Sequence, residues 1–150
     1  MEEFFQFEAD FVESLRCVPM QVRLKLDTCG VKLKLPQWNK FNQDDRQILV
    51  DTSCTTEPEI ADYRTLLHQM VLQRTGDTAT DLAIDPHPEW QNITTVPESV
   101  QDKSQAVGMI LSPAQWSALT PLRRFALIKL SRSGHENHNF LPALKEFQLI

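Results

Sequence analysis

The amino-acid sequence predicts a mainly α-helical protein of two pseudo-symmetric repeats, residues 18–72 and 96–150, each with a short extended segment after its first helix. Apolar residues recur at helical spacing, and each of the four glycines follows a predicted helix. One stretch also occurs twice, as VPMQVRLKLDTCGVKLKLPQW at 18–38 and VPESVQDKSQAVGMILSPAQW at 96–116. Each copy begins Val-Pro, has a glycine eleven residues after the proline and ends Gln-Trp.

A shift of 78 positions places residues 18–49 on 96–127 without a gap. Ten of these 32 positions are identical, whereas average composition predicts about two. The identities are Val18/Val96, Pro19/Pro97, Val22/Val100, Lys25/Lys103, Gly30/Gly108, Leu33/Leu111, Gln37/Gln115, Trp38/Trp116, Arg46/Arg124 and Leu49/Leu127. We interpret them as an internal duplication within a single domain of residues 1–150, with an N-terminal segment 1–17 and an acidic connector 73–95 outside the repeats.

The first helix of each repeat has a start signal and a stop signal. Pro19 and Pro97 suit the first helical position, where a missing N–H costs nothing. Gly30 and Gly108 are expected to end these helices in the left-handed conformation. The apolar stripe of the first copy consists of Val18, Val22, Leu26 and Cys29.

A short extended segment and a short helix follow each glycine. The alternation of residues 31–35 is typical of a strand, and residues 109–111 are its counterpart. Trp38 with Phe41, and Trp116 with Leu119, are spaced to pack down together from a short helix.

Capping residues predict where the later helices begin. Asn42 and Thr120 precede helices over 43–51 and 121–132. Thr56, with a glutamate three residues later, begins a long helix whose equivalent is the shorter 140–147. The stripe of the long helix consists of Ile60, Tyr63, Leu67 and Met70.

The N-terminal segment 1–17 carries its own apolar stripe. Phe4, Phe7, Phe11 and Leu15 fall at helical spacing and predict an amphipathic helix that closes the core. An aromatic anchor for a partner is the alternative.

Composition limits the classes of partner and location. The net charge of −5 argues against general nucleic-acid affinity. No apolar run is long enough to span a bilayer, and the start is acidic rather than signal-like. The three scattered cysteines fit a reducing compartment, so we expect a cytoplasmic protein that does not enter membranes.

The charges are separated along the chain. Six acids and no base lie between Arg74 and Lys103, whereas five bases and no acid occur from Lys103 to His135. Two interpretations stay open: surface patches of opposite sign, or pairing between neighbouring helices in the fold.

The stretch GHENHN at 134–139 is the most site-like in the chain. His135 and His138 with Glu136 could bind a divalent metal, as a metal-binding protein or enzyme would require. A polar loop that caps helix ends, or a contact loop for a protein partner, are the alternatives. Arg123 and Arg124 at a helix start leave a DNA-binding regulator as a further possibility.

No sequence motif predicts catalysis or a bound cofactor. The glycines are too far apart for a phosphate-binding loop, and no GxSxG or HExxH motif occurs. We therefore expect no cofactor and no catalytic or metal-binding residue.

Three stretches carry a family resemblance: FQFEADF at 5–11, LRCVPMQVRLKLDTCGVKL at 15–33 and FALIKLSRSGHENHNFLPALKEF at 125–147. With them the chain resembles the bacterial nitrate-reductase-associated protein family over nearly its whole length. The resemblance implies a non-enzymatic accessory protein. Its partner would be the catalytic subunit of an assimilatory, molybdopterin-dependent nitrate reductase, which it would help to mature or stabilise.

A partner surface is expected where the second repeat differs from the first. Shared positions are needed for folding, whereas the second repeat alone carries a net positive helix followed by GHENHN. Such a surface can steer an acidic partner. The candidate residues are Arg123, Arg124, His135, Glu136, Asn137, His138 and Phe140.

Overall fold

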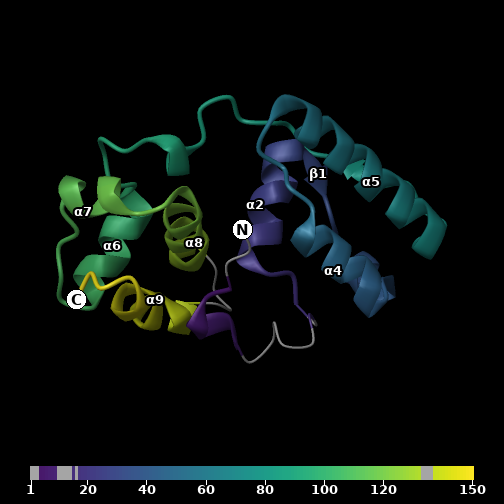
Figure 1. Cartoon of the computed structure of the whole chain (residues 1–150). Helices are drawn as coiled ribbons and strands as arrows, with labels where there is room; N and C mark the ends of the chain where they lie inside the picture. Colours follow the sequence, from purple (N-terminus) through teal and green to yellow (C-terminus); the bar gives the residue numbers. More distant parts are fainter. Residues whose placement is uncertain (1–3, 10–14, 16, 133–136) are drawn as a thin grey trace. The chain divides into compact units, whose positions relative to one another are not determined.

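The computed structural model describes residues 4–9, 15, 17–132 and 137–150. Its fold is mainly helical, with one small two-stranded sheet among these residues (Figure 1). The chain divides into two compact units. The first unit consists of Met1–Phe4 and Glu8–Asp85, and the second of Phe5–Phe7 and Pro86–Ile150.

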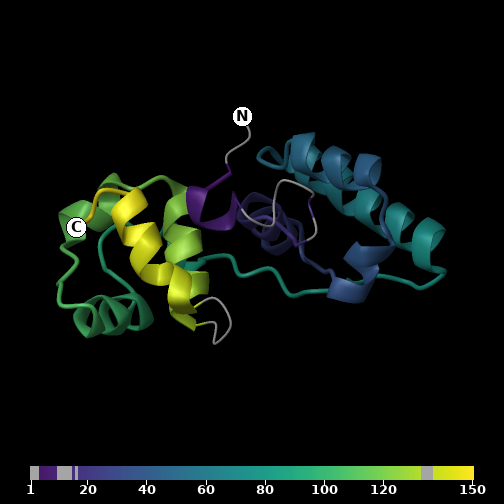
Figure 2. The same ribbon diagram turned by 90° about the horizontal axis from the view of Figure 1, so that it is seen from below.

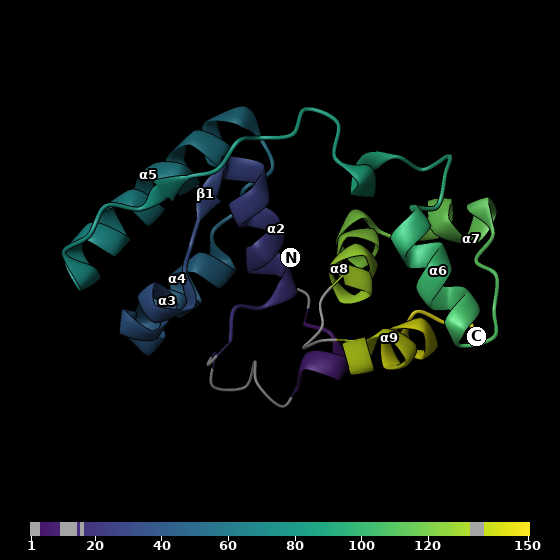
Figure 3. The ribbon, with the colours of Figure 1, turned by 180° about the vertical axis from the view of Figure 1, so that it is seen from behind.

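In the first unit, α2 packs against α5, α4 and strand β1 (Figure 3). Strand β1 pairs with β2 in antiparallel register, Val31 opposite Asp81 and Lys32 opposite Thr80. The elements are α2 (Met20–Cys29), β1 (Val31–Lys32), α3 (Leu35–Lys40), α4 (Gln43–Asp51), α5 (Glu57–Thr75) and β2 (Thr80–Asp81).

The predicted ends of the first helices are confirmed, and their starts move by one residue. Gly30 (φ 75°) and Gly108 (φ 86°) both adopt the left-handed conformation, and the Gly30 N–H donates to Leu26 O. Pro19 and Pro97 are extended and lie just before the first helical residue rather than at it. Either position uses the fixed φ of proline and its missing donor.

The helices α4 and α5 begin where their caps were predicted. The Asn42 side chain accepts a hydrogen bond from the Asp45 N–H, and Thr56 does the same for Glu59. In return the carboxylates of Asp45 and Glu59 accept from the N–H groups of Asn42 and Thr56. These reciprocal bonds satisfy donors that the first turn of a helix leaves unpaired.

Trp38 is the centre of the first unit's core. Its side chain is fully buried and packs edge-on against Phe41, and its Nε1 donates to Leu15 O at 2.9 Å. The predicted stripe of α5 is confirmed. The core also contains two of the three free cysteines, Cys29 and Cys54.

In the second unit, α8 packs against α6 and α9, and Figure 2 shows α9 alongside α8. The elements are η2 (Glu89–Gln91), α6 (Glu98–Ala106), α7 (Pro113–Ala118), α8 (Pro121–Arg132), η3 (Asn137–Asn139) and α9 (Phe140–Glu146). The predicted helix 121–132 is confirmed, with the Thr120 Oγ1 accepting from the Arg123 N–H at its start. Trp116 is again fully buried, and Leu119 is buried as well.

Residues 109–111, predicted to be a short extended segment like 31–35, differ from them in how their backbone groups are bonded. This segment has no strand partner within the described residues. Instead the side-chain amide of Gln101 accepts from Leu111 N (2.9 Å) and donates to Leu111 O (2.8 Å). One side chain thus satisfies the backbone groups that a neighbouring strand would otherwise satisfy.

The aromatic residues near the N-terminus differ from the predicted stripe. Phe5 is buried and packs with Phe7 and Phe147 in the second unit, whereas Phe4 is 40% exposed. The described part of the segment contains a 3-10 turn, η1 (Gln6–Glu8). Phe11 lies outside the described residues.

Of the helices that the structure describes, none combines the length and the apolar character needed to cross a bilayer.

Candidate functional site

Arg124, expected at a partner surface, lies inside the second unit. Its side chain is only 5% exposed. Its Nε donates to Trp90 O at 2.7 Å, and its Nη1 lies within hydrogen-bond distance of the carbonyls of Trp116, Ser117 and Leu119. Burial lowers the pKa of the guanidinium from its ordinary value. Arg124 therefore fixes the backbone between α7 and α8, and direct contact with a partner would require it to leave these carbonyls.

Arg46, which matches Arg124 in the 78-residue shift, has a similar role in the first unit. Its Nη1 and Nη2 donate to Leu15 O (3.1 Å) and Trp38 O (3.3 Å). Its guanidinium also lies 5.5 Å from the centroid of the Trp38 ring. In both units an arginine thus bonds the carbonyl of the buried tryptophan.

The other cations of α8 contact rings and acids of the second unit. Arg123 is half-buried, and its guanidinium lies 5.0 Å from the centroid of the Phe147 ring. Lys129 lies over the Phe125 ring, and Arg132 forms an ion pair with Glu89 of the preceding acidic block. The acidic and basic blocks of the sequence are therefore joined by an ion pair between Glu89 and Arg132, whereas Arg124 bonds backbone carbonyls.

The stretch GHENHN is described only at its end. His135 and Glu136 lie outside the described residues, and Asn137 begins η3. His138 is exposed, whereas Phe140 at the start of α9 is buried. Within the part of the chain that the structure describes, no three His, Cys, Asp or Glu side chains group as metal ligands.

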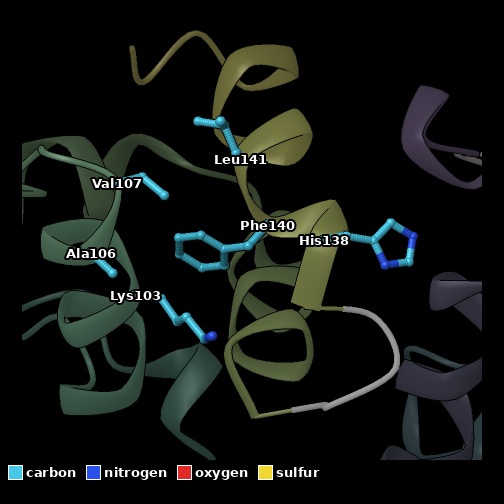
Figure 4. Close-up of a pocket in the computed structure, with 6 residues that line it drawn as sticks. All are labelled: Lys103, Ala106, Val107, His138, Phe140 and Leu141. Carbon is cyan, nitrogen blue, oxygen red and sulfur yellow. The ribbon is translucent and has the colours of Figure 1, made fainter.

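A small open pocket of about 300 Å³ lies between α6 and the start of α9. In Figure 4 the Phe140 ring points toward Ala106 and Lys103, whereas the His138 ring is turned the other way. The lining residues are Lys103, Ala106, Val107, His138, Phe140 and Leu141. Two of the predicted residues, His138 and Phe140, thus line the pocket together with Lys103, which the sequence analysis did not select.

Lys25, the counterpart of Lys103, has a very different environment. Its Nζ donates to Val50 O (2.7 Å) and Thr52 O (2.8 Å), with Leu49 O at 3.4 Å. Burial lowers the pKa of this ammonium group. Lys103 makes no hydrogen bond or ion pair with the described residues and is half-buried.

A second polar cluster lies in the core of the first unit. A hydrogen bond from Cys29 lowers the pKa of the Cys54 thiol, and the same contact raises the pKa of Cys29. Burial raises the pKa of Tyr63, whose hydroxyl donates to Leu49 O at 2.7 Å. The two thiols and this tyrosine are all buried, so the cluster is part of the core.

The family of the chain is identified from its sequence alone. No curated protein and no solved structure matches it. The model of the family described as conserved nitrate reductase-associated protein matches residues 4–147. Because that match spans nearly the whole sequence, including both units, this chain belongs to the conserved nitrate reductase-associated protein family.

Proposed function

We propose that the protein is a non-enzymatic, cytoplasmic partner of the catalytic subunit of an assimilatory, molybdopterin-dependent nitrate reductase, which it helps to mature or stabilise. The observation that carries this proposal is the family match over residues 4–147. The family's description names an association with nitrate reductase, and physical contact with that enzyme is part of our proposal.

The second unit is the proposed contact region. It carries six lysines and arginines against five acids, whereas the first unit carries nine against fifteen. A partner with an acidic surface is therefore repelled less by the second unit than by the first. His138 is exposed there, and Arg123 is half-buried, so both can contribute to the surface.

Arg124 and Phe140 have a supporting role in this proposal because both are buried. Arg124 bonds the backbone of Trp90 next to the start of α8, where Arg123 follows Thr120 and Pro121, and Phe140 lines the pocket. The remaining candidates, His135, Glu136 and Asn137, lie between Arg124 and Phe140 in the sequence.

We also propose that this surface is built on a duplicated scaffold. Three local bonds recur after the 78-residue shift. An arginine donates to the tryptophan carbonyl, the backbone N–H of Lys34 or Ser112 donates to Oε1 of the glutamine three residues later, and the N–H of Phe41 or Leu119 donates to tryptophan O. If residues 18–49 and 96–127 of an experimental structure superpose no better than unrelated fragments, the duplication is wrong.

The proposed function is tested by purifying the tagged protein from its native extract. We expect a molybdopterin nitrate reductase to co-purify, and the isolated chain to reduce no nitrate. The double variant Arg123→Ala with His138→Ala should retain less reductase, whereas the control Lys40→Ala, an exposed change in the first unit, should retain as much as wild type. Nitrate reduction by the chain alone, or absence of the reductase from the wild-type pull-down, would contradict the proposal.

A further inference from the structure

We propose that the pocket between α6 and α9 binds an acidic segment of the partner protein, with Lys103 holding a carboxylate and the apolar walls holding the side chain next to it. This inference rests on the proposed function and specifies the chemistry of the contact. Nothing in the family match assigns a role to this pocket or to Lys103.

The first argument comes from helix length. Helix α4 ends at Asp51, so the carbonyls of Leu49, Val50 and Thr52 lie at its end, where no later turn of the helix supplies a donor. The Lys25 ammonium takes all three. In the first unit this lysine is thus an internal cap.

The matching helix of the second unit is longer by three residues. In the 78-residue shift Arg132, the last residue of α8, corresponds to residue 54. Helix α4 already ends at Asp51, three residues earlier. The carbonyls that correspond to those of Leu49 and Val50 are those of Leu127 and Ile128, and they lie inside α8, where helical N–H groups bond them. Ile128 O also accepts from the Ser131 hydroxyl at 2.7 Å. Two of the three acceptors that Lys25 has are therefore bonded within the helix in the second unit, and Lys103 makes no hydrogen bond with the described residues.

The second argument is the chemistry of the pocket walls. Among the described lining residues, Lys103 supplies an ammonium group, and Ala106, Val107, Phe140 and Leu141 supply apolar surface. Val107 remains 39% exposed, so this surface is accessible. A single ammonium beside apolar walls matches one carboxylate next to an apolar side chain. A phosphate group would require several converging donors.

The openness of the site favours a protein segment over a free small acid. One ammonium and a few apolar contacts give weak binding by themselves. The same contacts become effective when the carboxylate belongs to a protein that is already held by a wider interface. The weakly basic second unit and the exposed His138 beside the pocket can belong to that interface.

The first experiment is NMR titration of the full-length protein with a capped aspartate–leucine dipeptide. We expect amide shifts to change at residues 103–107 and 140–141, with a dissociation constant that rises with salt. The neutral asparagine–leucine dipeptide should bind more weakly. The variant Lys103→Gln should raise the dissociation constant by about threefold, Lys103→Arg should restore it, and the control Lys40→Gln should leave it unchanged.

A second variant adds a negative charge to the pocket and leaves Lys103 in place. Val107→Asp adds a carboxylate at the rim, and it should abolish titration by the acidic dipeptide while leaving the circular dichroism spectrum unchanged. Equal binding of both dipeptides by wild type, or shifts that persist in Lys103→Gln and Val107→Asp, would overturn the proposal.

The reductase pull-down separates this inference from the proposed function. If wild type retains the reductase and Val107→Asp and Lys103→Gln lose it, both proposals hold. If all three proteins retain it equally, the accessory function stands and the pocket is not the docking site. If wild type retains no reductase, the proposed function fails. The inference then fails as well, because binding of the dipeptide would show an acid-binding pocket without its assigned partner.

Discussion

The two units place matching cations in opposite surroundings. In the first unit the lysine, Lys25, is bonded to three carbonyls, and the arginine, Arg46, is half-buried. In the second unit the arginine, Arg124, is buried among four carbonyls, and the lysine, Lys103, lies at an open pocket. The difference shows that a shared residue type does not fix a shared role. Which carbonyls are left unpaired by the neighbouring helices decides the role.

The largest expected difference between the units concerns the two arginines. Arg124→Met leaves buried carbonyls without a donor and should lower the free energy of unfolding by about 3 kcal/mol, whereas Arg46→Met should cost about 1 kcal/mol. Urea denaturation, followed by tryptophan fluorescence, measures both. Equal losses would mean that burial does not distinguish the two sites.

The glycines give the next contrast. Both have positive φ, so alanine at Gly108, where a Cβ would meet nothing within 4 Å, should cost about 1 kcal/mol. At Gly30 the same Cβ would lie 2.7 Å from Ile84 Cγ1 and 2.8 Å from Leu82 O. Gly30→Ala should therefore cost about 2–3 kcal/mol, as measured by thermal unfolding. A smaller loss at Gly30 than at Gly108 would contradict this packing.

The two lysines provide a control for each other. Lys25→Met removes the hydrogen bonds of the ammonium group to three carbonyls, of which Leu49 O keeps the Tyr63 hydroxyl, and should destabilise the protein by about 1–2 kcal/mol. Lys103→Met should change stability by less than about 0.5 kcal/mol, because the described residues give it no acceptor. The same denaturation assay decides the comparison, and a loss at Lys103 as large as that at Lys25 would show an internal bond in the second unit.

The smallest effect concerns an exposed cap in the first unit. Hydrogen bonds from the Thr56 N–H, the Thr55 hydroxyl and the Thr55 N–H lower the pKa of Glu59 from 4.5 to about 2. Because the folded-state pKa is lowered, the stabilisation is present above pH 4.5 and is lost as the pH falls toward 2. Glu59→Gln should have a lower melting temperature than wild type at pH 7, and the gap should narrow below pH 4.5. A gap that does not change with pH would exclude the carboxylate as its cause.

Helix boundaries could be predicted from the sequence because local chemistry sets them. Asn42, Thr56 and Thr120 bond backbone N–H groups a few residues away, and Gly30 and Gly108 adopt a conformation that other residues avoid. These interactions are close in sequence, so their residues identify them.

The candidate site was harder to predict because tertiary packing decides exposure. The charge pattern of the sequence predicts Arg124 at the surface, although its identity with Arg46 marks it as a shared position. By the rule that shared positions serve folding, it belonged to the scaffold. Lys103 shows where that rule fails, because the extra residues of α8 remove the acceptors that a shared lysine would bond. Near the N-terminus Phe5 is buried and the neighbouring Phe4 is exposed. Helical spacing alone does not predict which of these two phenylalanines is buried.

The placement of the cysteines makes thiol labelling a probe of one unit of the molecule. Cys17, Cys29 and Cys54 all belong to the first unit, and the second unit has none. The Cys29 thiol is fully buried, and its raised pKa disfavours the reactive thiolate. Alkylation of Cys29 therefore has to wait until the first unit opens. The labelling rate of this thiol therefore reports how often the first unit opens.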